Sequence, residues 1–79
     1  MKSEEKLLVH LAEHVRETLT SGHPLALQLP IEGIDDASEL QRAVREAERL
    51  GYFVHVEEGL GASFVVDVTG RGEQAFGVR

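Results

Sequence analysis

Residues 35–51, DDASELQRAVREAERLG, carry the strongest secondary-structure signal in the chain. Asp36 and Glu39 have the spacing of a capping box, and Gly51 stands where a helix commonly ends. Between them the apolar residues recur every three or four positions, which places them on one helix face: Leu40, Ala43, Val44, Ala47 and Leu50. Because such a face must be covered, the rest of the chain has to supply a second layer.

The remaining segments predict one more helix and three strands. Residues 4–19 form a helix whose apolar face carries Leu7, Leu8, Leu11, Ala12, Val15 and Leu19. The helix should end near Gly22 and Pro24, because glycine suits a left-handed cap and proline cannot continue a helix. In residues 25–29 every second residue is leucine, the pattern of a strand with one buried face. Residues 52–58 and 62–69 flank a glycine loop and predict a β-hairpin.

The apolar residues of the hairpin predict its register. Pairing Glu58 with Ala62 places three apolar pairs on the core face: Tyr52 with Val68, Val54 with Val66, and Val56 with Phe64. The opposite face then carries Phe53 across from Asp67, His55 across from Val65, and Glu57 across from Ser63.

These elements predict an α+β fold, a two-layer αβαββ sandwich in which two helices pack on one face of a small mixed sheet. All 79 residues should form a single domain. The first two strands should run parallel, because a helix crosses between them. For residues 70–79 two interpretations stay open, a C-terminal edge strand or a flexible tail, since three glycines weaken regular structure there.

Composition excludes several kinds of chemistry. The chain has no cysteine, so disulfides, thiolate metal sites and cysteine nucleophiles are absent. A net charge of −6 disfavours nucleic acid and favours basic protein surfaces. Residues 1–14 lack the apolar run of a signal peptide or membrane span, so we expect a cytoplasmic protein without membrane contact. Ser21, Ser38 and Ser63 lie at a predicted helix end, helix start and strand edge, and Asp35 and Asp36 suit a helix start, so no activated nucleophile emerges and we do not expect an enzyme.

Three segments carry a resemblance to a known family: LTSGHPLALQLP, the acidic helix start at Asp35 and Asp36, and ERLGYFVHVEEGLGASFVVDV. The run from about residue 15 to residue 68 resembles the later part of the SirA/TusA sulfur-carrier fold, a βαβαββ two-layer domain. Members of that family carry Cys-Pro-x-Pro after a first strand, and this chain has neither that strand nor a cysteine. The resemblance therefore implies a fold, and sulfur transfer does not carry over.

Two motifs suggest chemistry. Residues 10–14, HLAEH, fit the H-x-x-E-H pattern of inverzincin metalloproteases, and His10, His14 and Glu17 form a candidate metal-ligating set. A single small core leaves little room for a protease cleft, so we expect two solvated histidines and no resident metal. GRGEQA matches the dinucleotide fingerprint G-x-G-x-x-A, which needs a following helix and a further strand. Only residues 76–79 follow it, so we expect no cofactor and interpret its glycines as a turn and a loose tail.

Two surfaces are candidate interaction sites. On the second helix, Arg42, Arg45 and Arg49 share the side opposite the core, where Glu46 and Glu48 favour a solvated face over an anion site. The second surface is the far face of the hairpin. There Phe53, His55, Val65 and Asp67 would form an apolar patch beside carboxylates, together with Ala26.

We therefore expect a small acidic, non-enzymatic module that docks on another protein as an inhibitor, adaptor or antitoxin-like regulator. A homodimer could form through the open sheet face or an edge strand. One alternative is a nucleic-acid-associated regulator that uses the three arginines. Another is a metal-binding or degenerate sulfur-carrier-like accessory protein. Composition does not separate a cellular adaptor from a phage or mobile-element inhibitor that mimics nucleic-acid charge.

Overall fold

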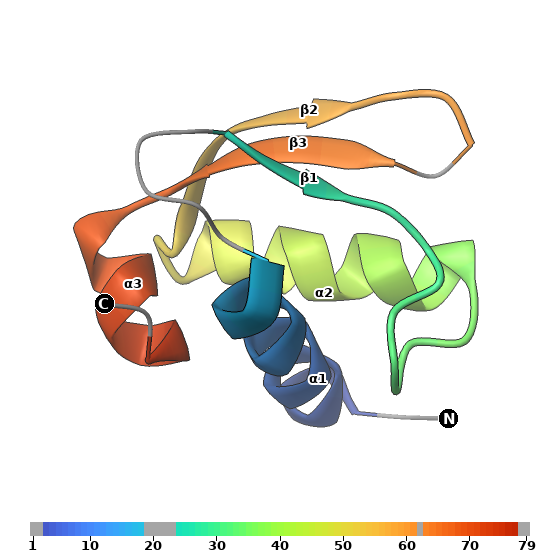
Figure 1. Cartoon of the computed structure of the whole chain (residues 1–79), viewed down its shortest axis with the longest axis horizontal. Coiled ribbons are helices and arrows are strands. Elements are labelled where there is room, and N and C mark those ends of the chain that lie inside the picture. The colour runs from blue at the N-terminus through green and yellow to red at the C-terminus, as the bar shows by residue number, and fades with distance from the viewer. Residues whose placement is uncertain (1–2, 19–23, 62, 78–79) are drawn as a thin grey trace.

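The computed structural model in Figure 1 describes residues 3–18, 24–61 and 63–77. This part of the chain forms helices α1 (Glu4–Thr18), α2 (Ala37–Arg49) and α3 (Gly70–Phe76), and strands β1 (Leu25–Leu27), β2 (Phe53–Glu58) and β3 (Phe64–Val68). The helices lie on one side of the sheet, as Figure 1 shows. The predicted α+β class and two-layer arrangement are confirmed. Leu19, Gly22 and Ala62, which the sequence placed in a helix, its cap and the hairpin, lie outside the described residues.

The sheet is antiparallel throughout, so the prediction of a mixed sheet was wrong. Its strand order is β1-β3-β2, and β3 runs antiparallel to both neighbours. Strands β1 and β2 therefore run in the same direction, as the connecting helix requires, but β3 separates them. Helix α2 connects β1 to β2 at the opposite edge of the sheet, and β3, the second strand of the hairpin, pairs with both strands between them.

Both long helices follow their sequence patterns. Helix α1 buries Leu7, Leu11 and Val15, and α2 buries Leu40, Ala43, Val44 and Ala47. Asp36 is the N-cap of α2, where its side chain accepts a hydrogen bond from the Glu39 amide at 2.8 Å. The Glu39 carboxylate in turn accepts a hydrogen bond from the Asp35 amide at 2.8 Å. The start of α2 is therefore held by side chains close to it in the sequence, which is why it could be predicted.

The predicted hairpin register was wrong, because Glu58 pairs two residues farther along the chain than expected and β2 contains a β-bulge. Next to the loop Glu58 pairs with Phe64 and Glu57 with Val65, whereas farther along Val54 pairs with Asp67 and Phe53 with Val68. His55 and Val56 therefore lie together opposite the single residue Val66. Strict alternation holds for β3 but not for β2, so Phe53 is 1% exposed in the core and Val54 is 40% exposed.

Residues 70–76 form helix α3, so the expected edge strand or flexible tail was wrong for them. The Thr69 hydroxyl caps the helix, accepting a hydrogen bond from the Gly72 amide at 2.9 Å and donating one to the Gly51 carbonyl at 2.6 Å. Gly77 ends the helix in the left-handed conformation, with a φ of 74°.

Tertiary packing explains why a glycine-rich segment becomes helical. Phe76 is buried, and its ring lies 5.5 Å from that of Phe53 and 5.4 Å from that of Tyr52, centroid to centroid. Gly72 lies so close to β2 that a Cβ there would overlap the Tyr52 carbonyl oxygen. The interpretation of these glycines as a turn and a loose tail is therefore replaced by a helix that needs glycine for close packing.

Candidate interaction surface on the open sheet face

Among the described residues, no helix covers the sheet face turned away from α1, α2 and α3. All three helices lie on its other side in Figure 1. On the open face Val65 is 43% exposed and Val54 is 40% exposed, and both lie inside strands rather than at loop tips. Ala26 pairs with Val65 from β1 and is also exposed, so the apolar surface continues across the third strand. We call this set, Ala26, Val54, His55, Glu57, Val65 and Asp67, the open-face patch.

The bulge determines which β2 residues belong to this patch. Val56 packs against the core, whereas Val54 and His55, two consecutive residues, both face outward. His55 has a φ of 53°, a left-handed conformation that strains any residue with a Cβ. Its Nδ1 lies 2.9 Å from Oδ2 of Asp67 on the neighbouring strand. Strained residues of this kind and bulges are concentrated at functional sites.

Carboxylates flank the apolar part of the patch. Glu57 pairs with Val65, and Asp67 pairs with Val54, so each shares the open face with an exposed valine. Glu58 instead pairs with the buried Phe64, and its carboxylate lies 3.9 Å from Arg45 of α2. Glu58 therefore belongs to the helix side of the sheet rather than to the open face.

Of the four hairpin residues predicted to form the interaction surface, the structure places three on the open face and one in the core. His55, Val65 and Asp67 lie on the open face, whereas Phe53 lies in the core because the bulge reverses the local alternation. The sequence reasoning missed Val54, which it had assigned to the core. No local feature of the sequence marks the bulge, since His55 fits a regular strand as well as a bulged one.

The arginines of α2 contact carboxylates. Arg42 lies 3.9 Å from Glu4 and Arg45 lies 3.1 Å from Glu48. Arg49 hydrogen-bonds Glu46, and this bond lowers the pKa of the Glu46 carboxyl and raises the pKa of the Arg49 guanidinium. The predicted basic stripe is therefore a surface of mixed charge.

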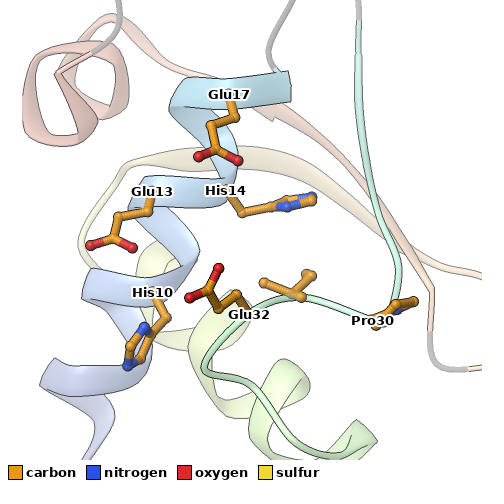
Figure 2. A pocket seen from close by; sticks show the side chains of 7 residues that line it. His10, Glu13, His14, Glu17, Pro30 and Glu32 are labelled. Atoms are coloured by element: carbon orange, nitrogen blue, oxygen red, sulfur yellow. The ribbon is translucent and has the colours of Figure 1, made fainter.

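The two histidines of α1 line a small cavity of about 70 Å³. Figure 2 shows its lining: His10, Glu13, His14, Glu17, Pro30, Ile31 and Glu32. The two imidazole rings point in different directions, that of His14 toward the segment at Pro30. No group of three His, Asp or Glu side chains within the described ranges could hold a metal ion.

His10 differs from the expected solvated histidine. Its Nδ1 is buried and has no hydrogen-bond partner among the described residues. Gly33, with a φ of 87°, lies against the ring so closely that a Cβ there would overlap it. The expectation was wrong at His10 because the connection between β1 and α2 folds over this side of α1, which sequence periodicity does not indicate.

A second apolar surface lies on the helix side. Leu8, Val9 and Ala12 of α1 and Tyr52 and Phe76 line an open groove of about 210 Å³. Val9 is 54% exposed there. Glu5 also lines this groove. None of the residues that line it has the positive φ found at His55, which separates the groove from the open-face patch.

Comparison of the chain with protein families, with curated proteins and with solved structures gives no match. The class of the protein therefore follows from its architecture: a small α+β domain whose described helices all lie on one face of an antiparallel sheet. Within the described residues no helix is long and apolar enough to cross a membrane.

Proposed function

We propose that this protein is a non-enzymatic binding module that docks on another protein through the open-face patch, acting as an inhibitor, adaptor or antitoxin-like regulator. The observation that carries the proposal is the pair of half-exposed valines, Val54 and Val65, inside a sheet face that no described helix covers. Contiguous exposed apolar side chains rimmed by polar residues are a feature of protein interaction sites.

The bulge supports the same proposal. A regular β2 strand would have placed His55 and Val54 on opposite faces, whereas the bulge places both on the open one. The strained backbone at His55 costs folding free energy that the core does not recover, because the side chain is 80% exposed. A binding role explains why such a conformation is kept at the surface.

The nucleic-acid alternative has less support. Each arginine of α2 contacts a glutamate, and the net charge of the chain is −6. Phosphate groups would have to displace these contacts against long-range repulsion. We therefore place the docking surface on the sheet rather than on α2.

The test is affinity capture of the tagged chain from lysate of its native host, treated with nuclease, using two variants with matched substitutions. Val65→Lys puts a charge into the open-face patch. Val9→Lys puts the same charge on α1, at a valine of similar exposure. Circular dichroism and thermal melting establish that both variants fold like the wild type.

We expect a stoichiometric protein partner that the wild type and Val9→Lys retain and that Val65→Lys loses. In light scattering, the mass of the complex should equal the mass of the partner plus that of one copy of the chain. A partner that Val65→Lys retains would contradict docking through the open face. Capture of nucleic acid alone, lost on nuclease treatment, would contradict the protein-binding function itself.

A further inference from the structure

We infer that the partner presents a basic surface to the open-face patch: an apolar side chain held between lysine or arginine residues. This inference rests on the proposed function, because it assigns the chemistry of the partner that docks on that same face. The evidence for a basic partner surface is the distribution of charge between the helical layer and the sheet.

Within the described residues, lysine and arginine are confined to the helical layer. The lysines and arginines that the structure describes lie on helices: Lys6 and Arg16 on α1, Arg42, Arg45 and Arg49 on α2, and Arg71 on α3. The three strands carry no lysine or arginine, although they carry Glu57, Glu58 and Asp67. The open face is therefore the side of the described structure on which carboxylates stand without a lysine or arginine on the same strands, although Asp67 contacts His55 there.

The register arranges these carboxylates around an apolar diagonal. Val65 lies between Ala26 and Glu57 in one cross-strand row, and Val54 lies beside Asp67 in the row two residues farther along β3. Diagonal neighbours on one sheet face lie about 7–8 Å apart, within reach of a single large side chain. An apolar residue of the partner can thus cover both valines while cations on either side of it meet Glu57 and Asp67.

Electrostatics disfavour the two other occupants of such a face. A symmetric dimer through the open face would bring Glu57 and Asp67 of both copies into one small interface, because a two-fold interface uses the same patch on each copy. Like charges placed together across an interface weaken it. Nucleic acid would bring phosphates toward the same carboxylates. A basic protein surface is the occupant whose charge complements this face.

The experiment uses the full chain labelled with ¹⁵N and two synthetic helical peptides. Both peptides have the same leucine stripe; lysines flank it in one and glutamates in the other. Amide chemical shifts report where each peptide binds, and titrations at about 0.05 and about 0.3 M salt report the electrostatic part of the affinity.

Two double variants with the same change in net charge complete the design. Glu57→Gln with Asp67→Asn removes the two carboxylates of the open face. Glu13→Gln with Glu17→Gln removes two exposed carboxylates from α1 and serves as the control.

We expect the lysine peptide, and not the glutamate peptide, to shift the amides of Ala26, Val54 and Val65. Its affinity should fall about threefold to tenfold in the open-face double variant and at the higher salt, as for two solvent-exposed charge contacts, and should stay unchanged in the control. Equal binding of both peptides to this face would overturn the inference about charge and leave docking through the face intact.

Three other results would also overturn the inference. One is that the lysine peptide leaves these amides unshifted; another is that it shifts α2 instead. The third is concentration-dependent shifts at Val54 and Val65 without peptide, which would make a second copy the occupant. The affinity capture with Val65→Lys and Val9→Lys tests the proposed function independently of the peptides. Failure of the proposed function can therefore be distinguished from failure of the inference about the partner's charge.

Discussion

Nδ1 of His55 lies 2.9 Å from Oδ2 of Asp67 across β2 and β3, although the His55 backbone has a φ of 53°. The contact links the bulge to the neighbouring strand on the open face. The His55 side chain is largely exposed and that of Asp67 about half exposed, so the pair contributes less than about 1 kcal/mol to folding. The contact therefore offsets only part of the backbone strain, which for a residue with a Cβ is roughly 1–2 kcal/mol.

This balance predicts the effect of removing the side chain. His55→Gly should raise the free energy of unfolding by about 0.5 kcal/mol, because glycine adopts a positive φ without strain and the lost contact is weak. Urea denaturation measures the change. Glu57→Gly, in the same strand without a positive φ, is the control and should lower stability by about 0.5–1 kcal/mol. Equal losses in both variants would show that His55 is not strained.

The bulged register makes a prediction opposite to that of a regular strand. Phe53 is 1% exposed and packs against Phe76, whereas Val54 is 40% exposed. Phe53→Ala should therefore cost about 3–5 kcal/mol of folding free energy, and Val54→Ala less than about 0.5 kcal/mol. Chemical denaturation of both variants decides between the registers. A larger loss of folding free energy in Val54→Ala than in Phe53→Ala would show instead that β2 alternates regularly, without the bulge.

The part of the fold that could be predicted is the part determined by local sequence. Helix α2 begins at a cap made by Asp36 and Glu39 and buries the predicted stripe, because these interactions span three or four residues. The bulge in β2 instead moves Phe53 into the core, where its ring contacts that of Phe76, a residue 23 positions away in the sequence. Alternation along β2 alone carries no trace of it, and the error moved Phe53 and Val54 to the wrong faces.

Helix α3 was also missed because it depends on tertiary contacts rather than on local sequence. Its glycines disfavour a helix locally, and packing of Phe76 against Phe53 and Tyr52 overrides that preference. Thr69 before the segment and Gly77 after it are cap residues that could have indicated the helix. For the candidate site, Val65 and Asp67 were identified because β3 alternates regularly. His55 lies on the expected face because β2 alternates from Glu58 to His55, and Val54 was missed because the alternation breaks there.

Two glycines of α3 should respond oppositely to alanine. A Cβ at Gly72 would overlap the Tyr52 carbonyl oxygen, whereas a Cβ at Gly70 has no atom within 4 Å. Gly72→Ala should lower the free energy of unfolding by about 1–3 kcal/mol through the forced displacement of α3 from β2. Gly70→Ala should raise it by up to about 1 kcal/mol, because alanine favours the helix. Thermal melting of both variants tests this; a neutral Gly72→Ala would contradict the close approach.

Zinc titration tests the histidine motif of α1. The rings of His10 and His14 point in different directions, and Nδ1 of His10 is buried. We expect isothermal calorimetry to show no 1:1 binding tighter than about micromolar, since zinc sites need three or four convergent ligands. His14→Ala should give the same trace as the wild type. A saturable 1:1 isotherm that His14→Ala abolishes would establish a zinc site at this helix.

The Glu46–Arg49 pair on α2 predicts a pH dependence. The hydrogen bond from Arg49 lowers the pKa of the Glu46 carboxyl in the folded protein. A carboxyl with a lowered folded-state pKa stabilises the fold above its unfolded pKa, and this contribution is lost as the pH falls through the folded value. The ¹³C titration of the Glu46 carboxyl should therefore have its midpoint below that of an ordinary glutamate.

Arg49→Gln should return this midpoint toward the ordinary value, because it removes both the hydrogen bond and the positive charge. The melting temperature of the wild type should also fall more steeply on acidification than that of Arg49→Gln. Arg71→Gln, which removes an arginine from α3, is the control for net charge and should leave the Glu46 midpoint in place. An unchanged midpoint in Arg49→Gln would mean that the carboxyl is stabilised by other groups, and the two residues would then contribute to stability independently.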